Sequence, residues 1–111
     1  MEISVTFKNI EPSDALKEYV EKRLGKLDKL LDKPTEARVV FSTEKTGHIA
    51  EISLKSSKLN IQAKERNDNM NAAIDIVVDK IKSQLNKFRK KIQSHKPRNL
   101  SKEDILYEEI P

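Results

Sequence analysis

Basic side chains gather in one short segment near the C-terminal end of the sequence. Residues 80–98 contain eight Lys or Arg residues and no Asp or Glu, whereas the formal charge of the whole chain is only +4. Ammonium and guanidinium groups form charge-assisted hydrogen bonds with phosphate oxygens. A run of basic residues without acidic neighbours is therefore typical of a surface that binds a polyanion. The alternative interpretation is an ordinary solvated helix face.

The spacing of apolar residues places this basic segment on a helix. Seven of them keep helical spacing over five turns and fall within about 100° of a helical projection: Ile74, Val77, Val78, Ile81, Leu85, Phe88 and Ile92. Six basic residues surround this apolar stripe: Lys80, Lys87 and Lys91 on one side, Lys82 and Arg89 on the other, and Lys90 on the outer surface. Like charges three and four residues apart cost a few tenths of a kcal/mol per pair. We therefore expect an external counter-charge.

A second basic group belongs to an earlier amphipathic helix. Ser13 is placed to cap the N-terminus of this helix, its apolar residues keep helical spacing up to Leu31, and Pro34 marks its end. Its C-terminal half contributes Arg23, Lys26 and Lys29. If the two helices are neighbours, the two basic groups form one surface. Six phosphate contacts would then give a log-log salt dependence of binding with a slope of about −4 to −5.

The rest of the sequence predicts four β-strands. Ile3, Val5 and Phe7 alternate with polar residues, and three more alternating runs follow, separated by turns at Thr46-Gly47 and Ser56-Ser57. The element order is therefore β-α-β-β-β-α, an α+β fold in which two helices cover one face of a four-stranded sheet. The crossover through the first helix predicts that strands one and two are parallel and that the remaining pairs are antiparallel.

The composition excludes several classes of function. The absence of Cys excludes disulfides, thiolate metal sites and a cysteine nucleophile, and only His48 and His95 remain as nitrogen ligands. No catalytic constellation is recognisable, so we expect neither an enzyme nor a cofactor or a small-molecule substrate. No apolar run approaches the roughly 18 to 20 residues that cross a bilayer, and the N-terminus lacks an export signal. We therefore expect a cytoplasmic protein.

The class of polyanion follows by elimination. Membrane binding would need free apolar residues on the basic helix, but the apolar stripe is expected to cover the sheet. The helix-turn-helix and zinc patterns that are typical of DNA-binding proteins are not found. Single-strand binding by stacking needs exposed aromatic residues, whereas Phe7 and Phe41 share the inward register. Structured RNA, which is recognised by its shape and phosphates, is the class that remains.

Two sequence blocks resemble a known family. "NDNMNAAIDIVVDKIKSQLNKFRKK" is similar to the family's Asp-Met-Tyr-x-Ala-Ile-Asp block followed by Lys-Leu-x-x-Gln-Leu-x-Lys, and "SDALKEYVEKRLGKLDKLLD" is similar to its first helix. The family is that of the ribosome hibernation promoting factors, also called ribosome-associated inhibitor A or sigma-54 modulation proteins. The resemblance covers residues 1–93. Two departures are Asn71, where Tyr is usual, and Ser83, where Arg is frequent.

The resemblance implies a fold like that of a double-stranded-RNA-binding domain and binding to the small ribosomal subunit, meaning its rRNA and neighbouring ribosomal proteins. There the family covers the decoding region, where tRNA and mRNA bind, and inhibits translation under stress or in stationary phase. The basic residues that match the family are Arg23, Lys26, Lys80, Lys87 and Lys91, with Lys90 where a basic residue is common. With Lys29, Lys82 and Arg89 they form the set of candidate RNA-binding residues. The alternative is a module that modulates a sigma factor or another protein partner.

We expect one monomeric ribosome-binding α+β domain over residues 1–95 and a polar, acidic tail over residues 96–111. Residues 99–111 contain one basic and four acidic residues. This tail resembles that of the short, tailed form of the family, in which it extends along the mRNA path. A different hypothesis is that the tail folds back on the basic helix and lowers non-specific RNA binding. Deleting residues 99–111 would then raise the affinity for arbitrary RNA at low salt.

Overall fold

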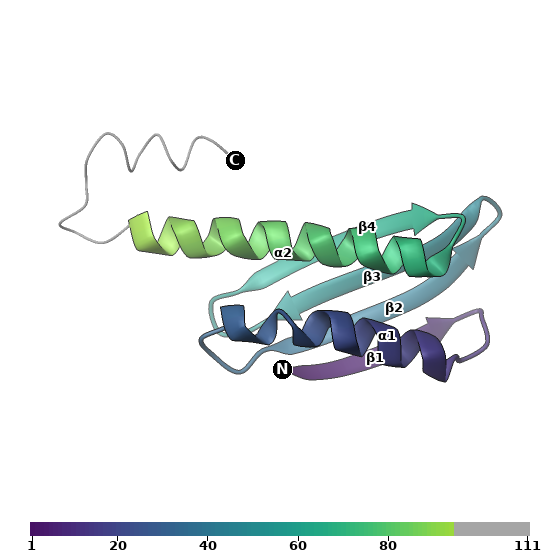
Figure 1. Ribbon diagram of the computed structural model, residues 1–111, viewed down its shortest axis with the longest axis horizontal. Helices are drawn as coiled ribbons and strands as arrows, with labels where there is room; N and C mark the ends of the chain where they lie inside the picture. Colours follow the sequence, from purple (N-terminus) through teal and green to yellow (C-terminus); the bar gives the residue numbers. More distant parts are fainter. Residues whose placement is uncertain (95–111) are drawn as a thin grey trace.

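Residues 1–94 of the protein form one sheet and two main helices (Figure 1). The structure, a computed structural model, describes residues 1–94, with side chains described up to residue 90. The elements follow in the order β1 (Glu2–Lys8), α1 (Asp14–Gly25), the short 3-10 helix η1 (Asp28–Leu30), β2 (Glu36–Glu44), β3 (Gly47–Lys55), β4 (Asn60–Asn67) and α2 (Met70–Ser94). This order confirms the predicted β-α-β-β-β-α architecture. His95 and the predicted tail, residues 96–111, lie outside the described residues.

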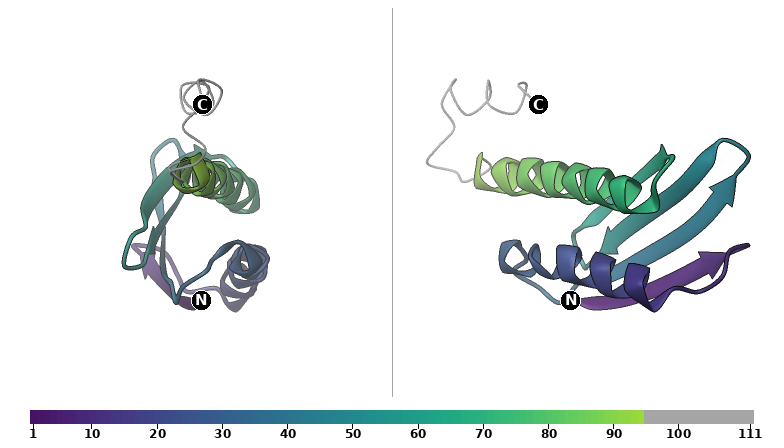
Figure 2. Two further views of the ribbon diagram at one scale, coloured as in Figure 1. Left: turned by 90° about the vertical axis from the view of Figure 1, so that its left-hand side faces the viewer. Right: turned by 45° about the vertical axis from the view of Figure 1, so that its right-hand side comes forward.

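The strands pair as the sequence predicts. β1 is parallel to β2, the β2–β3 and β3–β4 pairs are antiparallel, and the spatial order is β1-β2-β3-β4. Val5, Val39, Ile52 and Ala63 form one row across the sheet. Both helices cover the face that carries this row, and no helix of residues 1–94 lies on the opposite face (Figure 2). Side-chain alternation along the strands therefore separates a buried apolar face from an open face.

The apolar stripe of α2 is packed against the sheet. Ile74, Val77 and Ile81 are fully buried, and Leu85 is 1% exposed. α2 contacts β3 and β4, and the sheet supplies buried residues such as Ile52 to the same core cluster. Burial of each large apolar side chain contributes about 1.5–3 kcal/mol, so this stripe has a strong preference for the sheet over water. Within residues 1–94, no helix combines the length and the apolar character that a membrane span requires.

Short polar side chains cap the N-termini of both helices. The Oγ atom of Ser13 accepts a hydrogen bond from the Leu16 backbone N–H at 3.2 Å, which confirms the predicted cap of α1. The cap of α2 is Asn69, whose Oδ1 atom accepts from the Ala72 backbone N–H at 3.1 Å. The side chain of Asn67 accepts a bond from the Asn69 N–H at 3.1 Å, which closes the turn before the helix.

α1 ends at Gly25, several residues earlier than the apolar periodicity predicts. Beyond it the backbone bonds span three residues, from the Leu27 N–H to the Leu24 carbonyl at 2.9 Å and from the Leu31 N–H to the Asp28 carbonyl at 3.0 Å. This is the tighter geometry of a 3-10 helix. Glycine's low helix propensity favours the break, and a Cβ at Gly25 would meet no atom within 4 Å. Leu27 stays buried all the same, so the segment remains packed on the core.

Candidate nucleic-acid interface

The second half of α2 presents basic side chains to solvent. Lys82, Lys87 and Lys90 are exposed, and Arg89 is half-buried. Because Ile81 and Leu85 on the same helix are packed in the core, the helical period turns these basic residues away from the sheet. Lys91 also lies on α2, but it falls outside the described side chains. The part of the helix that the sequence singled out is therefore an outward-facing basic surface.

Lys26 and Lys29 add to this surface from the end of α1 and from η1. Both side chains are exposed, and among the described residues neither lysine takes part in an ion pair. Asp28 lies between them in the sequence but forms an ion pair with the N-terminal amine of Met1 at 3.2 Å. The N-terminus of the chain thus engages the acid that could have neutralised these two lysines.

Lys80, a candidate RNA-binding residue, is already paired with an acid of the protein. Its Nζ atom lies 2.6 Å from Glu65 Oε1 and 3.5 Å from the carbonyl oxygen of Lys64 on β4. The side chain is 50% exposed, while that of Glu65 is only 22% exposed. Lys80 therefore joins α2 to the edge strand and carries less uncompensated charge than its exposed neighbours. Its contact with RNA stays a prediction.

Arg23 also forms ion pairs inside the protein. Its Nε atom lies 3.3 Å from Asp75 Oδ1, and its Nη2 atom lies 3.8 Å from Asp79 Oδ1. Nε is buried and lacks the alignment of a hydrogen bond to a described residue. Both acids belong to the first half of α2, so Arg23 links the two helices. Partly exposed pairs of this kind contribute about 0–1 kcal/mol each, so the link orients the guanidinium more than it stabilises the fold.

Tyr19 completes the cluster around Asp75. Its hydroxyl donates a hydrogen bond to Asp75 Oδ1 at 2.5 Å. This bond raises the pKa of Tyr19 above the ordinary value of 10.0, with desolvation and the charge of Asp75 acting in the same direction and Arg23 opposing them. At neutral pH the phenol is therefore a fixed donor that holds the carboxylate beside Arg23.

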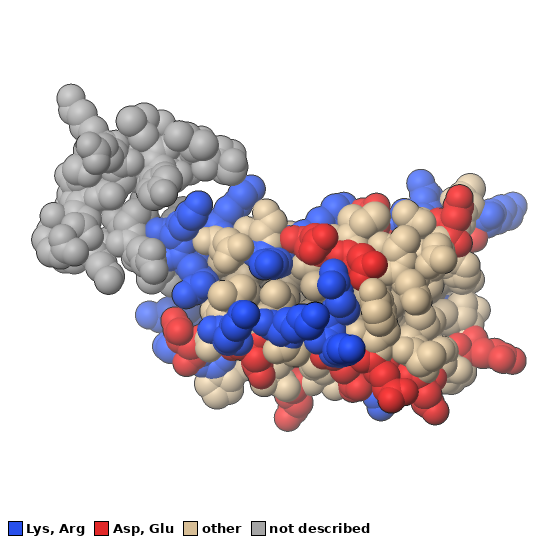
Figure 3. Space-filling model, in the orientation of Figure 1, with Lys and Arg blue, Asp and Glu red and all other residues tan. Residues whose placement is uncertain are grey.

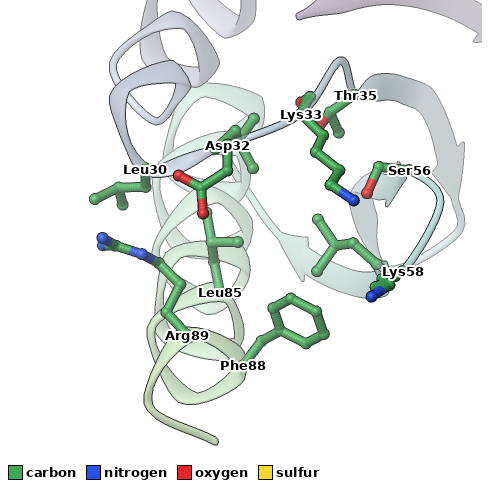
Figure 4. A pocket seen from close by; sticks show the side chains of 11 residues that line it. Leu30, Asp32, Lys33, Thr35, Ser56, Lys58, Leu85, Phe88 and Arg89 are labelled. Atoms are coloured by element: carbon green, nitrogen blue, oxygen red, sulfur yellow. Dashed lines mark hydrogen bonds between the residues drawn. The ribbon is translucent and has the colours of Figure 1, made fainter. Parts of the chain in front are cut away.

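The two basic groups meet at one end of the molecule. Figure 3 shows Lys and Arg side chains gathered most densely on the left part of the helical face, over the second half of α2 and the end of α1. Leu30 of η1 and Arg89 of α2 line the same pocket, which has a volume of about 160 Å³ (Figure 4). The segment after α1 and the second half of α2 thus meet at this end of the molecule, while a single binding surface that joins Lys26 and Lys29 to the basic residues of α2 stays a prediction. We call this area, defined by Lys26, Lys29, Lys82, Lys87, Arg89 and Lys90, the basic end surface.

Lys58 extends this surface in a way that the sequence does not predict. It lies in the β3–β4 turn and borders the same pocket as Arg89 and Lys33. Lys58 is isolated in the sequence from the other basic groups. Only the pairing of β3 with β4, and the packing of α2 across them, brings it to the end of the molecule where α2 is most basic.

The remaining candidate positions lie apart from this pocket. His48 is half-buried at the start of β3, and Asn71 and Ser83 are exposed on α2. No group of three or more side chains that could hold a metal ion occurs in the described part of the chain. The chemistry that this surface offers is the binding of anions by ammonium and guanidinium groups.

The chain is similar to known proteins over most of its length. A family model described as Sigma 54 modulation protein / S30EA ribosomal protein matches residues 3–93. The ribosome hibernation promoting factor of Escherichia coli strain K12 is 33% identical over 95 residues, which cover 86% of this chain and 100% of that protein. The family-model match includes both sequence blocks that suggested the family.

Solved structures share the fold. The crystal structure of the Thermus thermophilus Protein Y N-terminal domain matches with a TM-score of 0.73 and 34% identity, covering 79% of this chain and 99% of that one. A ribosomal subunit interface protein from Coxiella burnetii matches with a TM-score of 0.71 and 26% identity, covering 80% and 98%. Sequence and structure thus agree, and the chain belongs to the Sigma 54 modulation protein / S30EA ribosomal protein family.

Proposed function

We propose that this protein is a ribosome hibernation factor. In this proposal it binds the small ribosomal subunit at the decoding region, contacts rRNA phosphates, and inhibits translation under stress or in stationary phase. Residues 1–95 form the ribosome-binding domain, which acts in the cytoplasm as a monomer and without catalysis. The names of the relatives support a ribosomal role, since one is a ribosome hibernation promoting factor and another a ribosomal subunit interface protein.

The observation that carries the proposal is the basic end surface beside an apolar stripe that is buried as far as Leu85. Ile81 and Leu85 are held by the core and Phe88 is half-buried, so this part of α2 leaves little apolar surface for a lipid bilayer. Lys82 and Lys87 are exposed on the same turns and have no ion-pair partner among the described residues. Such charges gain most from a ligand that supplies closely spaced negative charges, as a folded RNA does.

The open face of the sheet supports recognition by shape rather than by base stacking. Phe41 is fully buried under the helices, and its ring centroid lies 5.4 Å from that of Phe7 on the same face. Ser4, Thr6 and Arg38 are exposed on the opposite face instead. Single-strand binders of the stacking type place aromatic rings on such a face. Contacts to phosphates and to the ribose edge of helical rRNA fit the basic helices better.

Arg23 and Lys80 have a distinct part in this proposal. Both keep acidic partners at 2.6–3.8 Å in the free protein, so a phosphate must share or displace a carboxylate to reach them. They therefore contribute fewer released counter-ions than Lys82 or Lys87. Their removal should change the orientation of bound protein more than the salt dependence of binding.

Co-sedimentation tests the proposal directly. Purified protein is centrifuged with small ribosomal subunits at near-physiological salt, with and without an excess of deacylated tRNA. Loss of co-sedimentation when tRNA is present would support binding at the decoding region, because both ligands would occupy the same site. Failure to sediment with subunits would contradict the proposal and favour a protein partner such as a sigma factor. If tRNA does not change the co-sedimentation, the placement at the decoding region is contradicted, while the ribosome remains the partner.

A further inference from the structure

The pocket at the end of the molecule has an apolar interior that is open to solvent. It lies between the segment after α1, the β3–β4 turn and the second half of α2 (Figure 4). Its apolar lining consists of Leu30, Leu31, Leu59, Leu85 and Phe88. Leu30, Leu31 and Phe88 are only half-buried, whereas Ile81, about two turns before Phe88 on α2, is fully buried. The pocket therefore offers accessible apolar surface to a further ligand.

Charged side chains at the rim restrict what this ligand can be. Lys33 and Lys58 lie on one side of the pocket, and Arg89 and Asp32 lie on the other (Figure 4). Three basic groups against one acidic group leave a net rim charge of +2. An occupant that combines apolar side chains with flanking carboxylates matches both features, because the apolar part enters the pocket while the acids remain at its rim.

The chain itself contains a segment of this composition. Residues 103–110 read "EDILYEEI", in which Ile105, Leu106 and Tyr107 are flanked on each side by two acidic residues. Four negative charges thus accompany three consecutive apolar side chains. This pattern complements the pocket in polarity and in the sign of its charge.

We propose that the segment Ile105–Tyr107 docks in the pocket formed by η1, the β3–β4 turn and α2, with its flanking acids against Lys33, Lys58 and Arg89. The reach is sufficient. Phe88 lies six residues before the end of α2, a distance of about 9 Å along the helix axis. The ten residues 95–104 can span about 33 Å when extended, so they can double back over this distance.

Docking in this pocket would make the tail a competitor of RNA. Arg89 belongs both to the pocket rim and to the basic end surface, so the acidic tail and an RNA backbone would compete for its guanidinium group. An intramolecular competitor that occupies its site three-quarters of the time weakens the apparent affinity about fourfold. Non-specific RNA would be rejected first, because its binding depends on charge alone. This consequence rests on the proposed RNA binding, whereas the docking itself does not.

A spin label on the tail tests the docking in the full chain. The protein has no Cys, so Ile110→Cys, which leaves all four flanking acids in place, provides a single site for a nitroxide label. NMR then measures paramagnetic broadening of the methyl signals of Leu30, Leu59 and Leu85. We expect selective broadening of these signals, while those of Ile49 at the other end of β3 stay sharp. If the signals of neither group are broadened, the proposal is overturned.

A second variant separates docking from general attraction between opposite charges. Ile105→Asp with Leu106→Asp, in the labelled chain, adds negative charge to the tail but removes its apolar part. The proposal predicts that the broadening at the pocket disappears, and that the affinity for an arbitrary RNA duplex at low salt rises, by about fourfold for an occupancy of three-quarters. Broadening that persists or grows in this variant would show attraction by charge alone and would overturn the proposed pocket. Loss of broadening without a change in RNA affinity would keep the docking but overturn its competition with RNA.

Discussion

Reversing the charge of Lys82 and Lys87 should weaken ribosome binding far more than an equal change of net charge elsewhere. Both side chains are exposed on α2, and neither has an ion-pair partner among the described residues. The variant Lys82→Glu/Lys87→Glu therefore breaks no contact that holds the fold together. Lys80 is left unchanged, because Lys80→Glu would place a second carboxylate beside Glu65.

The expected size of the effect follows from counter-ion release. Each lost phosphate contact reduces the log-log salt slope by about 0.7–0.9, so two contacts reduce it by about 1.4–1.8. The counter-ion contribution to affinity vanishes at about 1 M salt. At about 0.1 M salt, loss of the two contacts therefore lowers the affinity about 25- to 60-fold. Repulsion between the new carboxylates and the phosphates adds to this loss.

The assay is equilibrium binding to small ribosomal subunits over a salt series. The matched control is Lys8→Glu/Lys45→Glu, which changes the net charge by the same amount but alters exposed residues at the other end of the sheet. Urea unfolding establishes that both variants are folded. Equal loss of affinity in the two variants, or an unchanged salt slope for the α2 variant, would refute the assignment of the basic end surface as the RNA contact.

Three further predictions concern stability, each measured by urea unfolding. Ile81→Ala should cost about 2–5 kcal/mol, because the side chain is fully buried between α2 and the sheet. Tyr19→Phe should lower the unfolding midpoint at pH 7. The raised pKa of Tyr19 means that its contribution is present below pH 10 and lost as pH rises through the folded-state pKa, so the variant should lose this alkaline dependence. Gly25→Ala should stabilise the protein by about 0.4–1 kcal/mol, since a Cβ there meets no atom.

A midpoint for Ile81→Ala close to that of the unchanged protein would contradict the packing of α2 on the sheet. An alkaline transition that persists unchanged in Tyr19→Phe would mean that another group titrates. Destabilisation by Gly25→Ala would show that the end of α1 needs a conformation that alanine resists.

Local pattern was sufficient to predict the fold and the burial of its faces. The alternation of Ala50, Ile52 and Leu54 predicts which side of β3 is buried, and all three are fully buried. The stripe on α2 likewise predicts that its basic residues face outward. These features depend on periods of two and 3.6 residues, which are visible in the sequence itself. The ribosome was predicted as the partner from the family resemblance, because the periodicity of the sequence does not identify a partner.

Pairing between distant residues could not be predicted in the same way. Lys80 meets Glu65 across 15 positions, and Tyr19 meets Asp75 across 56. Both contacts depend on the distance between two packed elements, α2 and β4 in the first case and α1 and α2 in the second. No local pattern in the sequence predicts that distance. They alter the interpretation of the candidate site, since the charge of Lys80 is partly compensated. The early end of α1 shows a second limit, because the apolar period continues through Leu31 while Gly25 ends the helix.

In the proposed function, α2 and the end of α1 face rRNA in the decoding region. A cryo-electron microscopy map of the protein bound to the small ribosomal subunit would show this arrangement. We expect density in the tRNA and mRNA sites, with Lys82 and Lys87 against rRNA phosphates and the open face of the sheet turned away from them. Density elsewhere on the subunit, or a pose in which these lysines face solvent, would contradict it.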